Sequence, residues 1–204
     1  MPFAGKAEFL SLTALALTIV YAAIERRLSQ FKTGVFFLGI ALILAAIGTA
    51  LPQSETHSVL LENPTYGVHV IFMVLGFVSL ALGAIYALMF VLLERQLKKR
   101  ELGMFFKRLP ALFDLARMSK TGTLSGVALL AFGMSLGYML AFTVDGFDLY
   151  DTKLMISNGI IAGYIIGISS AKIKAFSGVN IAYATILWFS VLVISVGFAS
   201  HTFV

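Results

Sequence analysis

Six long apolar stretches limit what this chain can fold into more than any other feature. About 20 consecutive apolar residues in a helix cross the hydrocarbon core of a bilayer. All 15 Lys and Arg and all 10 Asp and Glu lie between the apolar runs or at their ends. The sequence therefore predicts an all-α integral membrane protein, a single domain over residues 1–204, whose six transmembrane helices cover residues 7–25, 33–52, 66–93, 123–142, 154–171 and 178–201.

The composition excludes several classes of protein. Hydrophobic residues make up 59% of the chain and charged residues only 12%, about half the charged share of a soluble domain. A water-soluble domain of 204 residues cannot bury so much apolar surface, so a water-soluble enzyme is excluded. Cysteine is absent, which excludes disulfides, thiolate metal sites and thiol catalysis.

The charges between the apolar runs predict the orientation of the chain. The loops after the first, third and fifth predicted helices hold 13 of the 15 basic residues. The loops between them are mainly acidic, with Glu55, Glu62, Asp145, Asp148 and Asp151. Because cytoplasmic loops carry the excess of Lys and Arg, we expect both termini on the periplasmic side of a bacterial-type inner membrane. The net charge of +5 then faces anionic lipid headgroups, and no nucleic-acid partner is expected.

The longest basic loop has a helical pattern of its own. Lys107, Arg108, Asp114 and Arg117 are interleaved with apolar residues that recur at helical spacing, namely Phe105, Phe106, Leu109, Leu112, Phe113 and Ala116. This pattern predicts an amphipathic helix over 105–120 on the inner membrane surface. The alternative is an ordinary loop with scattered apolar residues.

Glycines with four-residue spacing are typical of helices that approach one another closely in lipid. The chain has four such pairs: Gly122 and Gly126, Gly133 and Gly137, Gly159 and Gly163, and Gly163 and Gly167. We interpret them as packing contacts within one bundle. The alternatives are dimerisation, or space for a flat cofactor beside the fourth and fifth helices.

Two of the three histidines are expected at the same depth in the membrane. His69 lies near the start of the third predicted helix, which runs inward, and His201 lies at the end of the sixth, which runs outward. Two imidazoles at the outer end of a bundle can hold haem iron between them as axial ligands, and the haem propionates would reach water or Lys153. The alternative is that the two rings only anchor the helices at the headgroups. His57 is in a polar loop and is interpreted as solvated, and a structural zinc site lacks the four side-chain ligands it usually needs.

Four segments together resemble a known family of membrane proteins. They are Tyr66-Gly67-Val68-His69-Val70, Leu92-Leu93-Glu94-Arg95-Gln96-Leu97-Lys98, Leu109-Pro110-Ala111-Leu112 and Ser200-His201-Thr202-Phe203. In order, spacing and topology they resemble the cytochrome c assembly family, meaning CcsA, CcmC and their HemX-like relatives. The resemblance extends from about Glu25 to the C-terminus. It implies that His69 and His201 are the two ligands of an external haem.

The sequence departs from that family in the loop between the two histidines. Members that handle haem carry a Trp-rich loop there, known as the WWD domain, whereas this chain has Leu149-Tyr150-Asp151-Thr152-Lys153. Asp151 and Lys153 match the family's Asp and Lys, but the only Trp of the chain is Trp188. The WWD loop is thus degenerate, and the inner histidines of the larger synthases find no match.

The sequence therefore predicts a membrane protein that holds a b-type haem near the outer face. The haem-binding residues would be His69 and His201, with Asp151, Lys153, Tyr150 and Tyr66 as neighbours. Its role would be cytochrome c maturation or haem handling, without bond-making chemistry of its own. The alternative is a haem-bearing or structural accessory subunit of a membrane respiratory electron-transfer complex. Either role implies membrane lipid and other membrane subunits as partners. A haem-free permease and inner-face regulation through the basic loop are further alternatives.

Overall fold

The structure, a computed structural model, describes residues 6–28, 34–51, 64–100, 110–142, 152–170 and 178–198. Nearly all of these residues are helical, which confirms the all-α prediction. The helices are α1 (Lys6–Leu28), α2 (Gly34–Ala50), α3 (Pro64–Lys99), α4 (Leu112–Ala141), α5 (Thr152–Ser170) and α6 (Gly178–Phe198).

Four helices of the described residues are long and apolar enough to cross a membrane. Their qualifying segments are Ala7–Arg26, Pro64–Lys99, Leu112–Ala141 and Gly178–Ser195. Shorter apolar segments lie in α2, at Phe37–Ala50, and in α5, at Asn158–Gly167. The chain is thus a multi-pass helical membrane protein by length and composition. The exact count of six crossings stays a prediction.

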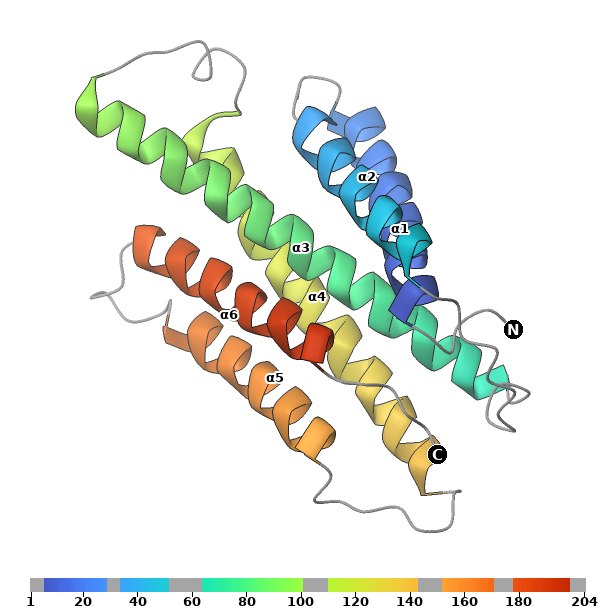
Figure 1. Cartoon of the computed structure of the whole chain (residues 1–204). Helices are drawn as coiled ribbons and strands as arrows, with labels where there is room; N and C mark the ends of the chain where they lie inside the picture. Colours follow the sequence, from blue (N-terminus) through green and yellow to red (C-terminus); the bar gives the residue numbers. More distant parts are fainter. Residues whose placement is uncertain are drawn as a thin grey trace.

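Helix α3 is the centre of the bundle (Figure 1), and it contacts α1, α4 and α6. The α1–α2 hairpin lies on one side of α3, and α5 and α6 lie on the other. Phe77 of α3 meets Phe9 of α1 at a ring-centroid distance of 5.7 Å and Phe189 of α6 at 5.6 Å. Consecutive helices run in opposite directions (Figure 1), as the alternating loop charges predict.

Glycines bring α3 and α4 into backbone contact along most of their shared length. A Cβ built on Gly122 would lie 2.9 Å from the backbone nitrogen of Gly83, and one on Gly126 would lie 2.8 Å from that of Leu80. Real Cβ atoms essentially never approach backbone so closely, so only glycine permits this separation. The interpretation of these glycines as packing contacts within the bundle is confirmed for α3 and α4.

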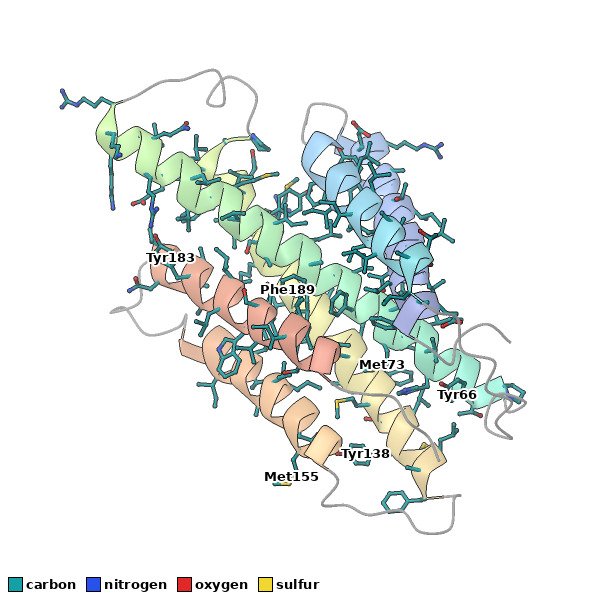
Figure 2. The ribbon with its side chains drawn as sticks, viewed as in Figure 1. Tyr66, Met73, Tyr138, Met155, Tyr183 and Phe189 are labelled. Atoms are coloured by element: carbon teal, nitrogen blue, oxygen red, sulfur yellow. The ribbon has the colours of Figure 1, made fainter. Side chains whose placement is uncertain are left out.

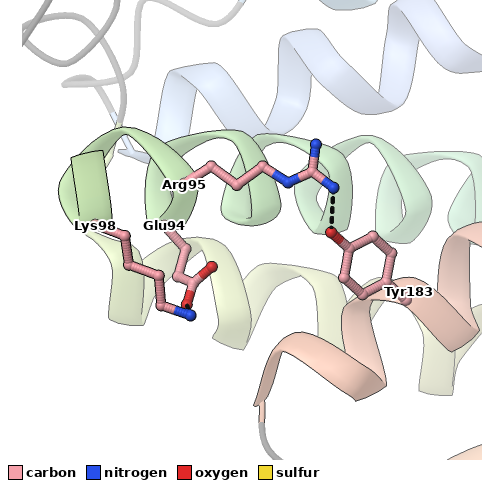
Figure 3. Close-up of polar contacts among 4 residues, drawn as sticks. All are labelled: Glu94, Arg95, Lys98 and Tyr183. Carbon is pink, nitrogen blue, oxygen red and sulfur yellow. Dashed lines mark hydrogen bonds and ion pairs between the residues drawn. The ribbon is translucent and has the colours of Figure 1, made fainter. Parts of the chain in front are cut away.

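The basic end of α3 is tied to the start of α6 by polar contacts (Figure 3). Arg95 Nη2 donates a hydrogen bond to Tyr183 Oη at 2.6 Å, and its guanidinium carbon lies 5.9 Å from the Tyr183 ring centroid. One turn further along, Lys98 Nζ and Glu94 Oε1 form an ion pair at 2.5 Å. α3 ends at Lys99, and the next residue, Arg100, has a φ of 56°.

The predicted surface helix over 105–120 is wrong for the part that the structure describes. Residues from Leu112 onward form the first turns of α4, which continues to Ala141 without a break. Leu115 is fully buried and Ser119 is 8% exposed, whereas Phe113, on the predicted apolar face, is 76% exposed. The side of this segment that packs into the bundle is thus a different one from the predicted apolar face. Residues 105–109 lie outside the described residues.

Candidate functional site

His69 lies in the second turn of α3 and bonds to the backbone of α4. Its Nδ1 is 2.6 Å from the carbonyl oxygen of Gly133. A carbonyl oxygen only accepts hydrogen bonds, so Nδ1 carries the proton in this contact. A neutral imidazole protonated at Nδ1 keeps its lone pair on Nε2. The contact therefore leaves Nε2 as the nitrogen able to ligate a metal.

Gly137, one turn further along α4, provides the space for the imidazole ring. A Cβ at this position would lie 2.7 Å from Cε1 and 3.0 Å from Nδ1 of His69. The ring is thus fixed by a hydrogen bond at one point and by the bare backbone of Gly137 at another. On the α3 side, the Tyr66 ring lies 6.2 Å away between centroids.

The local sequence explains why these groups meet. His69 and Met73 are four residues apart and share one face of α3, while Gly133 and Gly137 are four residues apart and share one face of α4. The two helices are antiparallel, so each step along α3 is matched by a step back along α4. The facing pairs are His69 with Gly137, Met73 with Gly133, Gly76 with Leu130, Leu80 with Gly126, and Gly83 with Gly122.

A second polar contact ties α5 to the same end of the bundle. Asn158 Nδ2 donates a hydrogen bond to Tyr138 Oη at 2.5 Å. Tyr138 follows Gly137 directly in α4. Figure 2 shows Tyr66, Met73 and Tyr138 at one end of the molecule, with Tyr183 at the other. The end that holds His69 is therefore connected to α4 and, through Tyr138, to α5.

The structure describes two of the predicted haem-binding side chains, His69 and Tyr66. Lys153 lies in α5, but its side chain is outside the described part. Tyr150, Asp151 and His201 lie outside the described residues, as does His57. α6 runs antiparallel to α3, and its last described residue, Phe198, is at the end that points toward the Pro64 half of α3 (Figure 1).

The donor chemistry of His69 fits a haem. Metal-ligating histidines nearly always donate their other ring N–H to a carbonyl or carboxylate, which fixes the tautomer and the ring orientation. The bond from Nδ1 to Gly133 is such a contact. Within the described ranges, no group of three or more His, Cys, Asp or Glu side chains is placed to hold a metal ion. A porphyrin supplies four of the iron ligands itself, so one or two axial histidines suffice.

The sequence analysis found His69 but missed its partners. Gly133 and Gly137 stood out only as packing residues, and the sequence analysis did not connect them with His69. The available signal was a combination: His69 and Met73 on one helix, and Gly133 and Gly137 on the next, have the same four-residue spacing at corresponding ends of two antiparallel helices. Asn158 and Tyr138 carried no such signal.

Comparison with known proteins gives one match. The family model described as Cytochrome C assembly protein matches residues 4–201, which is nearly the whole chain. Neither the curated proteins nor the solved structures gave a match.

Proposed function

The chain belongs to the cytochrome c assembly protein family, and on this premise we propose that it binds a b-type haem through His69 and His201. The family supports a role in cytochrome c maturation. The haem and its two ligands are our proposal. The observation that carries it is the hydrogen bond between His69 Nδ1 and the Gly133 carbonyl oxygen, at 2.6 Å.

His69 is prepared as an axial ligand before any haem arrives. The Gly133 carbonyl sets the tautomer, and Gly137 sets the position of the ring. A ligand held in place loses little rotational freedom when it binds the metal, so less of the binding free energy is spent on ordering it. Both contacts come from the α4 backbone, which the glycine packing against α3 holds in register.

The second ligand would be His201, three residues beyond the described end of α6. The antiparallel course of α6 beside α3 supports this assignment, because it directs the end of α6 toward the His69 half of the bundle. Tyr150, Asp151 and Lys153, before and at the start of α5, would lie near the propionates, with Tyr66 beside His69. Lys153 would neutralise a propionate charge.

The direction of the helices supports a periplasmic location for this haem. The basic residues Arg95, Lys98 and Lys99 cluster at the opposite end of α3 from His69, and basic flanks mark the cytoplasmic side. In a bacterial inner membrane the haem would then face the compartment where cytochromes c mature. The chain itself would bind and orient the haem without making or breaking bonds.

Visible spectroscopy of the purified protein tests this proposal. We expect a Soret band and low-spin α and β bands in the wild type. In His69→Ala and His201→Ala these bands should weaken or become high-spin. His57→Ala is the matched control and should have the wild-type spectrum. Unchanged low-spin bands in both ligand variants would refute the assignment.

A second measurement separates haem handling from electron transfer. Haem that leaves the protein for an added apocytochrome, in preference to bovine serum albumin, supports a role in maturation. Haem that stays bound and titrates as a reversible one-electron couple with a partner oxidoreductase would instead assign the chain to a respiratory complex.

A further inference from the structure

A cavity of about 560 Å³ lies at the other end of the bundle, between α3, α4, α5 and α6. One of its lining residues on α3 is Ala87, which lies about five helical turns, or roughly 27 Å, along that helix from His69. It is therefore separate from the His69 site. Small residues from several helices leave the space open, among them Ala87, Ala182, Ala184, Gly167 and Gly178.

Trp188 keeps α5 and α6 apart beside this cavity. A Cβ on Gly163 would lie 2.5 Å from Trp188 Cη2, and a Cβ on Gly167 would lie 3.9 Å from Trp188 Nε1. The indole thus lies along the glycine stripe of α5. Together with Phe90 it gives the cavity an aromatic wall.

One polar group in the wall is left unsatisfied. Tyr164 lines the cavity and is 2% exposed, and no donor or acceptor among the described residues bonds its buried hydroxyl. A buried hydroxyl without a hydrogen-bond partner lowers the free energy of unfolding, because the water it bonded in the unfolded state is not replaced. By contrast, Thr123 and Thr185, which also line the cavity, donate to Ser119 and Ile181 carbonyl oxygens at 2.9 and 3.0 Å. Tyr164 is thus the residue of this wall whose hydroxyl has no partner among the described residues.

These features limit the chemistry of the occupant. It must fit an aromatic, largely apolar space, and it must carry a hydrogen-bond acceptor that can reach the hydroxyl of a buried tyrosine. The ester oxygens of a phospholipid stay at the headgroups, and a fatty-acid carboxylate would stay at the exposed Lys120 on the rim. A para-quinone ring is flat and apolar, carries carbonyl oxygens on opposite edges, and has a tail that remains in the bilayer.

We propose that this cavity binds the ring of a membrane quinone, with Tyr164 Oη donating to one of its carbonyl oxygens. Phe90 and Trp188 flank the ring, and Lys120 is a second donor at the rim. The proposal concerns binding alone. It does not depend on the haem site, because the two sites share no residue.

The only tryptophan of the chain lies in the cavity wall and serves as the probe. The protein is reconstituted in phosphatidylcholine–phosphatidylglycerol vesicles and titrated with decyl-ubiquinone while Trp188 fluorescence is recorded. We expect saturable quenching beyond the linear collisional background. Removing the donor in Tyr164→Phe should raise the half-saturation concentration about five- to tenfold. Tyr183→Phe, on the outside of α6, is the matched control and should leave the curve unchanged.

Two further variants and one competing ligand test the proposal. Ala184→Leu fills the cavity and should abolish the saturable quenching of Trp188. His69→Ala should have the wild-type quinone titration curve. A failure of the haem proposal is therefore distinguishable from a failure of the quinone proposal. Quenching that stays linear in quinone, or that Tyr164→Phe does not alter, overturns the proposal. Saturable quenching by dibrominated stearic acid that decyl-ubiquinone does not displace also overturns it, since the cavity would then be a lipid site.

Discussion

The two ends of the bundle use small residues for opposite purposes. Around His69, glycines of α4 face α3, and the helices touch at their backbones, so that a single carbonyl and a missing Cβ fix an imidazole. At the other end, glycines of α5 face Trp188, and the indole spaces α5 from α6 beside a cavity. A stripe of small residues therefore produces either a close-packed contact or an open space. The residue on the opposite helix decides which.

The largest effect should come from closing the gap at the α3–α4 contact. In Gly122→Ala the new Cβ would lie 2.9 Å from Gly83 N and 3.0 Å from its Cα. Backbone cannot move aside as a flexible side chain can, so we expect a loss of about 2 kcal/mol in unfolding free energy. Thermal unfolding in detergent should shift down by about 4–8 °C. Gly39→Ala, with nothing within 4 Å of its Cβ, is the control. Equal stability of the two variants would contradict backbone contact.

A smaller effect is expected at the His69 end. In Gly137→Ala the added Cβ would lie 2.7 Å from Cε1 of His69, so the ring must turn away from its ligating position. We expect haem affinity to fall about tenfold, which equals roughly 1.4 kcal/mol, measured by haem titration of the apoprotein in the Soret band. Gly67→Ala, two residues from His69 and without a close neighbour, should keep the wild-type affinity. Equal affinities for all three proteins would show that the ring position does not matter.

A milder loss of stability is expected from a substitution at the contact between α5 and Trp188 of α6. Gly163→Ala places a Cβ 2.5 Å from Cη2 of Trp188, but an indole can turn where backbone cannot. We expect a loss of about 1 kcal/mol with a clear shift of the Trp188 emission maximum. Gly159→Ala has no neighbour within 4 Å and should leave the emission unchanged. An unshifted spectrum in Gly163→Ala would show that the indole does not lie on Gly163.

The smallest effect is expected at the exposed polar contacts. Tyr183→Phe removes the acceptor of the 2.6 Å bond from Arg95 but keeps the ring under the guanidinium. Exposed contacts of this kind contribute at most about 1 kcal/mol, so thermal unfolding should change by only a few degrees. Lys98→Ala, which breaks the ion pair with Glu94, should change even less, and its effect should vanish in high salt. A loss as large as that of Gly122→Ala would mean that these contacts hold the bundle together.

Much of the fold was predictable from local pattern. The helices follow the apolar runs, and their alternating direction follows the loop charges, because insertion into a bilayer depends on stretches of about 20 residues. The one wrong element is the surface helix over 105–120, because residues from Leu112 onward continue α4. Leu115 is fully buried, whereas Phe113 on the predicted apolar face is 76% exposed, so the apolar pattern did not show which side of the segment packs against another helix.

The sequence by itself determined that this is a membrane protein of apolar helices, and it singled out His69 near one end of α3. Only the tertiary structure decided that the Gly133 carbonyl oxygen, 64 residues away, accepts a hydrogen bond from its Nδ1, and that Tyr164 lines a cavity with no partner for its hydroxyl among the described residues. The reason is that lipid tails are as apolar as leucine. Hydropathy therefore places helices in the membrane, but it does not choose which faces meet, because packing and hydrogen bonding between distant segments set that choice.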